Sequence, residues 1–404
     1  MMREGKRLAI LGGLLMAASL PYPASTPTGW AADPFDEINQ RFQERKSEGD
    51  DALLGLQNQY RSKRAAMEAQ WARREQEIEA RWQERKREIE QKWEQAVRST
   101  RKEWVDYSPS NDTRSIVNFE EGTVEVTALV PVPPKEKPGG RSRADVVAAA
   151  QEEVARQFER ILAEQTGGKK ALLSGQVQGR AGRPVDRQSA KAFVQQDVLP
   201  AAVVDDKPVE SRDGVTRVKV TAKVKMTPDH LKKRAQQYLD AVMTQSRRYQ
   251  LDPRLVLAVM HTESYFNPKA ESHIPAYGLM QLVPRAAARD SYNFIYKDDR
   301  VLDDDYLFVP PQNVELGAAY LYLLKNKIFS DLPDNGDKKL YVVICAYNWG
   351  PGNIRKRILK PYRIQDMTDA QVFALLTDKA PEETRNYLKR VTERMALYDE
   401  LIGP

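Results

Sequence analysis

The 404-residue chain contains one cysteine and three histidines. A single cysteine, Cys345, excludes an internal disulfide and a zinc site built from thiolates. The histidines His230, His261 and His273 are not spaced as metal-ligand pairs. We therefore expect no metal site and no other cofactor.

Strong charge of one sign is also missing. The net charge is +6 and the isoelectric point is near 9.1, which is modest for this length. Such a balance suits an anionic polymer but does not distinguish nucleic acid from cell wall. Because no concentrated basic patch is present, nucleic-acid binding is the least favoured class.

The apolar run near the N-terminus is short. Residues 8–20 follow a basic start (Arg3, Lys6 and Arg7) and precede several prolines. A run of about 13 residues is too short to cross a bilayer, which takes about 20, but it is typical of an export signal. Residues 1–31 are therefore predicted to be a signal peptide, with cleavage after Ala31; cleavage after Ala24 is the alternative. No cysteine that could carry a lipid lies nearby.

Glycine and proline are almost absent from residues 36–104, which contain 16 basic and 15 acidic residues. Apolar residues recur there every 11 positions, in two series: Tyr60, Trp71, Trp82, Trp93, Trp104 and Leu56, Met67, Ile78, Ile89. Eleven residues span about three helical turns, so the pattern predicts one long helix with a single apolar stripe. The stripe would serve self-association, binding of a protein partner, or contact with the rest of this chain. The alternative is a row of indoles that stack on sugar rings.

Residues 108–226 have the pattern of a small α+β domain. Residues 115–119 and 123–130 flank the turn at Gly122, which predicts a β-hairpin. Residues 144–164 have helical periodicity, and residues 214–226 alternate like a half-buried strand. No chemical motif lies in this region, so we expect a platform or interaction module.

Residues 227–404 are predicted to form an all-α domain. Thr227-Pro228 and Asp252-Pro253 are both helix-start signals. In the second of these helices, Glu263 continues an apolar stripe. Burial disfavours an ionised carboxylate, so we expect a raised pKa for Glu263, as a general acid needs.

Four short motifs follow in order: Glu263-Ser264, then GLMQ at 278–281, then AYN at 346–348 with glycines after it, then ETRNY at 383–387. Together they resemble the ordered motifs of the family 1 lytic transglycosylases. The segments TRSIVNFEEGTVEV and VKMTPDHLKKRAQQYL also resemble the domain that precedes the catalytic domain in a membrane-bound branch of this family. The whole fold is thus expected to be a long N-terminal helix, a small α+β domain and a C-terminal lysozyme-like domain.

The resemblance implies cleavage of the MurNAc-β-1,4-GlcNAc bond of peptidoglycan with formation of 1,6-anhydro-MurNAc ends, in the periplasm of a Gram-negative bacterium. It implies that Glu263 is the single catalytic acid/base and that peptidoglycan glycan strands are the partner. The residues implied to bind substrate are Ser272, Met280, Gln281, Tyr347, Asn348 and Tyr387. Met280 fits a core position equally well.

Two other functions stay open at this stage. A peptidoglycan hydrolase of the goose-type lysozyme kind needs a second carboxylate or a placed water, and Glu271 is the candidate carboxylate. A wall-binding structural protein with an inactive catalytic domain is the other alternative. Analysis of the cleavage products separates all three.

Overall fold

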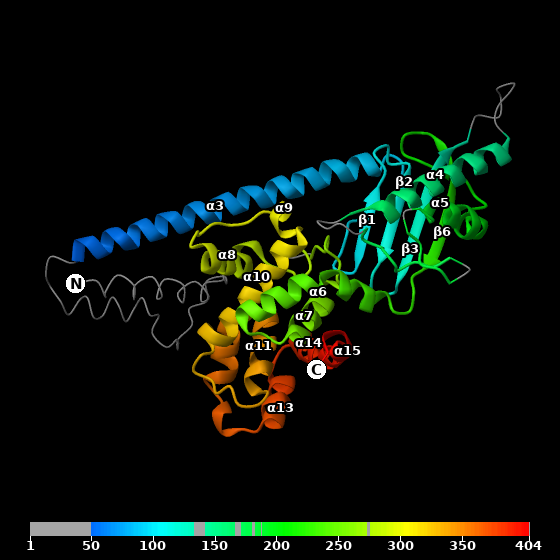
Figure 1. Ribbon diagram of the computed structural model, residues 1–404. Coiled ribbons are helices and arrows are strands. Elements are labelled where there is room, and N and C mark those ends of the chain that lie inside the picture. Colours follow the sequence, from blue (N-terminus) through cyan, green and yellow to red (C-terminus); the bar gives the residue numbers. More distant parts are fainter. Residues whose placement is uncertain are drawn as a thin grey trace. The chain divides into compact units, whose positions relative to one another are not determined.

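The computed structural model describes residues 50–132, 142–165, 171–179, 182–186, 188–272 and 275–403 (Figure 1). The predicted signal peptide, residues 1–31, lies outside this part of the chain. Two compact units are present. Of the described residues, those within 77–283, 303–318 and 392–403 form the sheet-containing unit, and those within 50–76, 284–302 and 319–391 form the helical unit. Each unit combines separate stretches of the chain, so the units do not test the predicted domain boundaries, which stay a prediction.

The sheet-containing unit is built on a six-stranded antiparallel sheet in the order β1-β2-β3-β6-β4, with β5 also paired to β6. The strands are β1 (Glu103–Tyr107), β2 (Thr113–Asn118), β3 (Thr123–Pro131), β4 (Val203–Val204), β5 (Val209–Glu210) and β6 (Thr216–Lys225). The predicted hairpin is confirmed as β2 and β3, and the predicted returning strand is β6, which pairs with β3.

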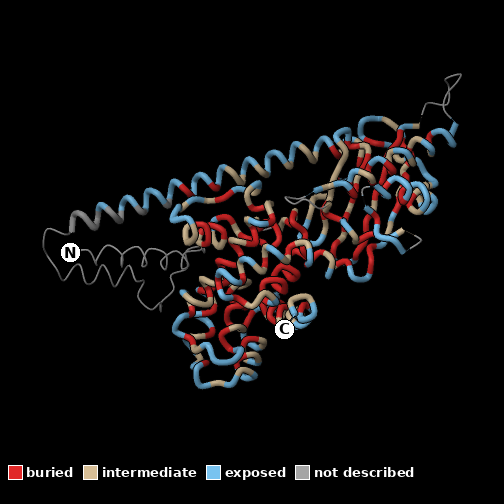
Figure 2. The backbone as a smooth tube through the Cα atoms, in the orientation of Figure 1, coloured by how far each residue is buried: buried red, intermediate tan, exposed pale blue. Residues whose placement is uncertain are grey.

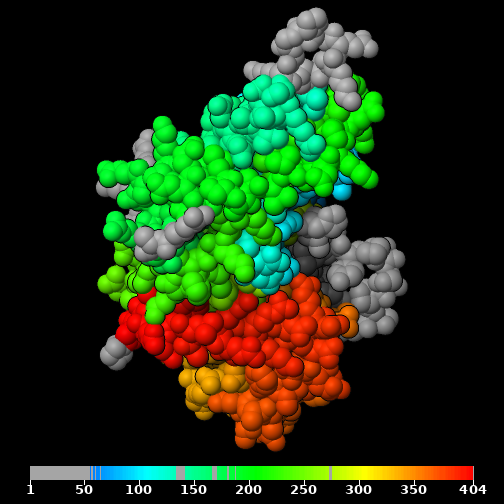
Figure 3. Space-filling view, turned by 90° about the vertical axis from the view of Figure 1, so that its right-hand side faces the viewer, coloured from blue at the N-terminus to red at the C-terminus, as the bar shows by residue number. Residues whose placement is uncertain are grey.

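Helix α4 (Arg143–Ala163) covers one face of this sheet. Its N-terminus is a capping box between Ser142 and Asp145, which satisfies backbone N–H groups that the helix leaves free. Phe158 and its apolar neighbours on α4 pack on buried strand residues such as Val126 and Val220. Buried residues lie along the strands and on the side of α4 that faces them (Figure 2). The other side of α4 lies on the surface, in teal (Figure 3).

The long charged helix is shorter than the sequence predicts. Helix α3 (Asp50–Ile89) ends 15 residues before Trp104, which lies instead in β1. Residues 90–95 form a turn. The sequence period of 11 therefore extends beyond the end of the helix. Trp104 is apolar for a different reason from the residues on the helix, because it is buried in the core formed by the sheet and α4.

The stripe of α3 packs partly on its own chain. Ile89 and Trp93 form an apolar cluster with Ala96 and with Leu129 of β3, and Trp82 packs beside it. Burial of Trp93 and Trp104 shows that these two indoles are not available for stacking on sugars. Contact with the rest of the chain is therefore the confirmed role of this end of the stripe.

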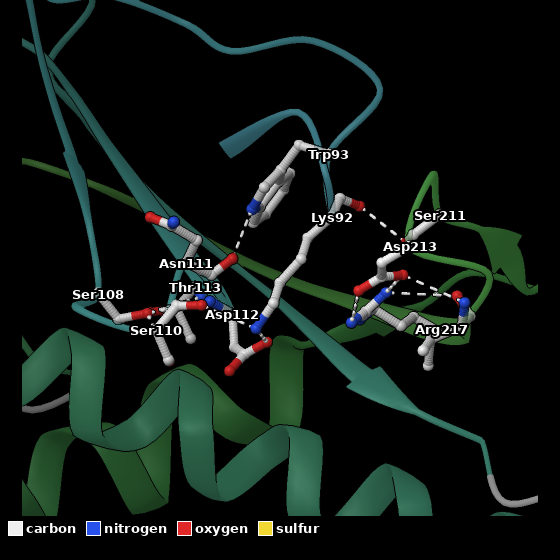
Figure 4. Close-up of polar contacts among 11 residues, drawn as sticks. Lys92, Trp93, Ser108, Ser110, Asn111, Asp112, Thr113, Ser211, Asp213 and Arg217 are labelled. Carbon is white, nitrogen blue, oxygen red and sulfur yellow. Dashed lines mark hydrogen bonds and ion pairs between the residues drawn. The ribbon is translucent and has the colours of Figure 1, made fainter. Parts of the chain in front are cut away.

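Polar contacts join the turn after α3 to two loops of the sheet (Figure 4). The Trp93 indole N–H donates to the Asn111 carbonyl over 2.7 Å. The Lys92 ammonium contacts the Asp112 carboxylate at 2.6 Å, and the Ser211 hydroxyl donates to the Lys92 carbonyl. Because the partners come from the β1–β2 turn and the loop after β5, the chain leaving α3 has a defined path.

The remaining elements are helices, as predicted for the C-terminal region. The longer ones are α6 (His230–Tyr249), α7 (Pro253–Ser264), α8 (Arg289–Tyr296), α10 (Pro310–Leu323), α11 (Lys338–Trp349), α13 (Asp369–Lys379) and α14 (Glu382–Ala396). Short helices are α5 (Ala190–Phe193), α9 (Asp304–Leu307), α12 (Pro351–Ile354) and α15 (Asp399–Ile402). Helix α6 begins at His230, later than the Thr227-Pro228 signal predicts, whereas α7 begins at Pro253 as predicted.

Candidate active site

Glu263 is the last residue but one of α7. The helix begins with Asp252 as its cap, whose carboxylate accepts from the Arg254 N–H over 2.8 Å, and with Pro253 in the first turn. Every residue from Leu255 to Ser264 is buried, and the Glu263 side chain is 8% exposed. The predicted burial of Glu263 on an apolar helix is therefore confirmed, while its raised pKa stays a prediction.

The end of α7 is held by a buried arginine. Tyr265 and Phe266 have φ of 50° and 58°, the left-handed conformation that terminates helices. The Arg234 guanidinium on α6 donates to both of their carbonyls and lies 3.7 Å from the Phe119 ring. Burial lowers the pKa of Arg234 to about 10, so it stays charged at neutral pH. A cation at these carbonyls also suits the negative end of the helix.

A tight loop follows α7 and carries the GLMQ motif. Gly278 has φ of +76°, and a Cβ there would lie 2.4 Å from the Leu307 carbonyl, so only glycine fits. The Asn313 amide donates to the carbonyls of Tyr277 and Leu307 and accepts from the Met280 N–H. Asn313 comes from α10 and is fully buried. Its three hydrogen bonds fix the conformation of residues 277–280.

The predicted substrate residues of this loop differ in exposure. Gln281 is nearly buried, and its amide N–H groups donate to the carbonyls of Ala270 and Gly278. Its Oε1 is buried and has no hydrogen-bond partner within the described residues, and its role as a glycan ligand stays a prediction. Ser272 is half-buried. Met280 is fully buried against Gly317, which fits the core alternative rather than a sugar contact.

Glu271, the candidate second carboxylate, is paired with an arginine. The Arg98 guanidinium donates to both of its carboxylate oxygens, over 3.3 Å from Nε and more closely from Nη2. Arg98 also contacts Glu79 at 3.5 Å and lies 5.3 Å from the Trp82 ring, both on α3. Burial raises the pKa of Glu271, and the charge of Arg98 opposes that rise.

Residues 98–102, which we call the arginine segment, run beside the residues that follow Glu263. The Asn267 amide donates to the Thr100 carbonyl over 3.3 Å, and the Arg101 guanidinium lies 4.0 Å from the Glu263 carboxylate. Sequence reasoning missed this segment because the period of 11 predicted a helix through it. A polar run such as Arg98 to Lys102 gives no signal of a helix end, because residues 83–88 form an equally polar run inside α3.

Tyr347, Asn348 and Tyr387 belong to the helical unit. Tyr347 packs edge-on against Tyr320, with ring centroids 5.5 Å apart. The Thr384 hydroxyl on α14 donates to the Asn348 amide oxygen on α11 over 2.7 Å, and this contact joins two of the sequence motifs. Tyr387 is buried. The roles of these three residues beside Glu263 stay predictions.

His261 has a structural role. Its ring stacks on Phe266, and its Nδ1 is 2.8 Å from the Tyr398 hydroxyl. Burial lowers the pKa of His261 to about 3, and the charge of Arg394 adds to this effect. Across the part of the chain that the structure describes, no three His, Cys, Asp or Glu side chains gather as a metal site would require.

Comparison with known proteins identifies the class. Residues 240–368 match the family model described as Transglycosylase SLT domain. Residues 71–237 match the one described as Membrane-bound lytic murein transglycosylase C, N-terminal domain. An α+β region followed along the chain by a helical region that carries Glu263 is therefore that of a lytic transglycosylase, which is an enzyme.

Two curated relatives carry the assignment further. The chain is 32% identical over 303 residues to membrane-bound lytic murein transglycosylase C of Klebsiella pneumoniae, covering 73% of this chain and 81% of the relative. The protein of that name from Shigella sonnei matches equally well, at 32% over 303 residues. The chain belongs to the membrane-bound lytic murein transglycosylase C family.

The solved structures that match cover a smaller share of the chain. The 70 kDa soluble lytic transglycosylase of Escherichia coli is 25% identical, with a TM-score of 0.34 over 43% of this chain and 26% of that one. This match is too partial to bear on fold or function. Although the curated relatives are called membrane-bound, none of the helices described in this chain is both long and apolar enough to cross a bilayer.

Proposed function

We propose that this enzyme cleaves the β-1,4 bond between N-acetylmuramic acid and N-acetylglucosamine in peptidoglycan and leaves 1,6-anhydro-muramic ends. The observation that carries the proposal is the burial of Glu263 at the end of α7, in a chain of this family. A carboxylate so removed from water is suited to hold and return a proton.

In the proposed reaction Glu263 acts twice. Its carboxyl proton first goes to the glycosidic oxygen as the bond from C1 of the muramic sugar breaks. The resulting carboxylate then takes the proton of the muramic C6 hydroxyl, whose oxygen bonds to C1 and closes the anhydro ring. No water is consumed, so no second carboxylate is needed to activate one.

The pairing of Glu271 supports this route over hydrolysis. A hydrolase that activates water with a second carboxylate needs that carboxylate available as base or nucleophile. Glu271 is instead engaged on both oxygens by Arg98. Gln281, whose buried amide oxygen has no hydrogen-bond partner within the described residues, is proposed to bind the glycan, and Ser272 to steady the N-acetyl group.

The proposed place of action is the periplasm. Peptidoglycan lies outside the cytoplasm, and residues 1–31 have the pattern of an export signal.

The test is product analysis of purified peptidoglycan by mass spectrometry with wild type, Glu263→Gln and Glu271→Gln. We expect anhydro-muramic ends from wild type and from Glu271→Gln, and a rate lower by about 10²- to 10⁴-fold for Glu263→Gln. Reducing ends that vanish in Glu271→Gln would establish the hydrolase instead. No cleavage by wild type would support the wall-binding alternative.

A further inference from the structure

Arg101 places a positive charge beside the proposed acid. Its Nη1 lies 4.0 Å from Glu263 Oε2, and its side chain is 45% exposed while that of Glu263 is 8% exposed. Arg101 therefore reaches solvent and the buried carboxylate at once. A solvent-exposed cation thus lies 4.0 Å from the carboxylate of Glu263.

The residues on both sides of Arg101 are held by other contacts, and the Lys102 carbonyl accepts from the Phe119 N–H over 2.8 Å. Arg98 is paired with Glu271, and the Thr100 carbonyl accepts from Asn267. On the other side, Lys102 is paired with Glu120 at 2.5 Å. Among the described residues, Glu263 is the carboxylate that Arg101 faces within ion-pair distance. The segment thus presents one cation to the acid from an anchored backbone.

The pair between Arg101 and Glu263 is loose. A separation of 4.0 Å is longer than the 2.7–3.2 Å of a direct N–H···O hydrogen bond. A guanidinium nearby also stabilises the ionised carboxylate, whereas the first step of the proposed reaction requires a protonated one. An arginine that stayed with Glu263 would oppose catalysis, so a substrate group that draws it away would assist.

The substrate supplies a group of the right charge. The muramic sugar at the scissile bond carries a peptide stem with free carboxylates, and a guanidinium binds a carboxylate through two parallel hydrogen bonds. We propose that Arg101 binds a stem-peptide carboxylate and so makes the enzyme selective for glycan strands that carry stems. Binding of the stem exchanges the partner of Arg101 and so removes a positive charge from beside Glu263, which favours the protonated carboxyl. This inference rests on the proposed role of Glu263.

The experiment compares two substrates: strands with stems, and the same strands stripped of stems by an amidase. The rate of anhydro-end formation gives kcat/KM for wild type, Arg101→Gln, Arg101→Lys and Arg156→Gln. Arg156 is an exposed arginine on α4, paired with Glu153, and serves as the matched control. Thermal unfolding checks that each variant is folded.

We expect wild type and Arg156→Gln to prefer stem-bearing strands. For Arg101→Gln, kcat/KM on those strands should fall about 10-fold, chiefly through KM, because one charge-assisted contact is lost. On stripped strands the variant should be as fast as wild type or faster, and Arg101→Lys should recover part of the preference.

An equal loss on both substrates, or an unchanged preference in Arg101→Gln, would overturn the role of Arg101. Glu263→Gln is assayed alongside to keep the two proposals apart. If wild type produces reducing ends, or Glu263→Gln cleaves normally, the proposed function itself fails. If Glu263→Gln is inactive and only the stem preference is unmoved, the Arg101 proposal alone fails.

Discussion

Replacing Arg98 with glutamine is expected to destabilise the sheet-containing unit in a pH-dependent way. Arg98 supplies the charge that opposes the pKa rise of the buried Glu271 carboxyl. The Glu271 side chain is 19% exposed and that of Arg98 is 34% exposed, so the pair lies between a surface and a buried ion pair. Exposed pairs contribute up to about 1 kcal/mol, and breaking a buried pair costs about 3–5 kcal/mol. With solvent screening of Arg98, we expect a loss of about 2 kcal/mol at neutral pH.

The pH dependence of this loss is set by protonation of the Glu271 carboxyl. In Arg98→Gln the folded-state pKa of Glu271 rises further above its unfolded value. The folded variant then binds more protons than the unfolded chain over a wider range, so its stability falls as pH rises through that range. At pH 4 Glu271 is largely protonated in the variant and the penalty should shrink.

Denaturant unfolding of wild type, Arg98→Gln, Glu271→Gln and the double variant at pH 4 and pH 7.5 measures this effect. The double variant should be more stable than the sum of the single losses implies, because removing Glu271 removes the uncompensated charge. Equal destabilisation at both pH values, or strictly additive losses, would refute the reasoning.

Two further predictions concern stability. Gly278→Ala should lower the free energy of unfolding by about 3 kcal/mol in denaturant unfolding. Both its φ of +76° and the Leu307 carbonyl, 2.4 Å from the added Cβ, oppose a side chain there. A loss below about 1 kcal/mol would mean that the loop adapts freely. The pKa of His261 is near 3 when folded and 6.5 when unfolded, so stability should be complete above pH 6.5 and fall by about 2 kcal/mol by pH 5. His261→Gln should flatten that part of the stability–pH curve, and an unchanged slope would exclude His261 as its cause.

Local patterns predicted the individual elements of this chain well. The Asp252-Pro253 signal marked the start of α7, the turn at Gly122 marked the hairpin of β2 and β3, and alternation marked β6. Capping, turns and strand burial depend on neighbouring residues, so local sequence is enough to predict them. The apolar stripe likewise marked Glu263 as buried. These features need no knowledge of what packs where.

Long-range contacts were beyond the same reasoning. Arg98 and Glu271 are 173 residues apart in the chain, and nothing in either local sequence pairs them. Asn313 supports the GLMQ loop from a different helix, where a buried asparagine looks like any polar helical residue. The helix prediction was wrong beyond Ile89. Trp93 and Trp104 fall on the period of 11 that a helix would show, but they are apolar because they pack on strand residues from elsewhere in the chain.

Because α3 ends at Ile89, a deletion that tests the role of this helix has to stop before the sheet begins. Strand β1 begins at Glu103 and is the outermost strand beside β2. Deleting residues 36–104 would remove the start of that strand and leave backbone N–H and C=O groups of β2 without partners. Open edges of this kind recruit strands from other molecules, so such a protein would tend to aggregate whatever the helix does. A cut before Glu79 removes most of the helix yet spares Trp82 and Arg98. Loss of activity in that shorter deletion would then report on the helix itself rather than on a damaged sheet.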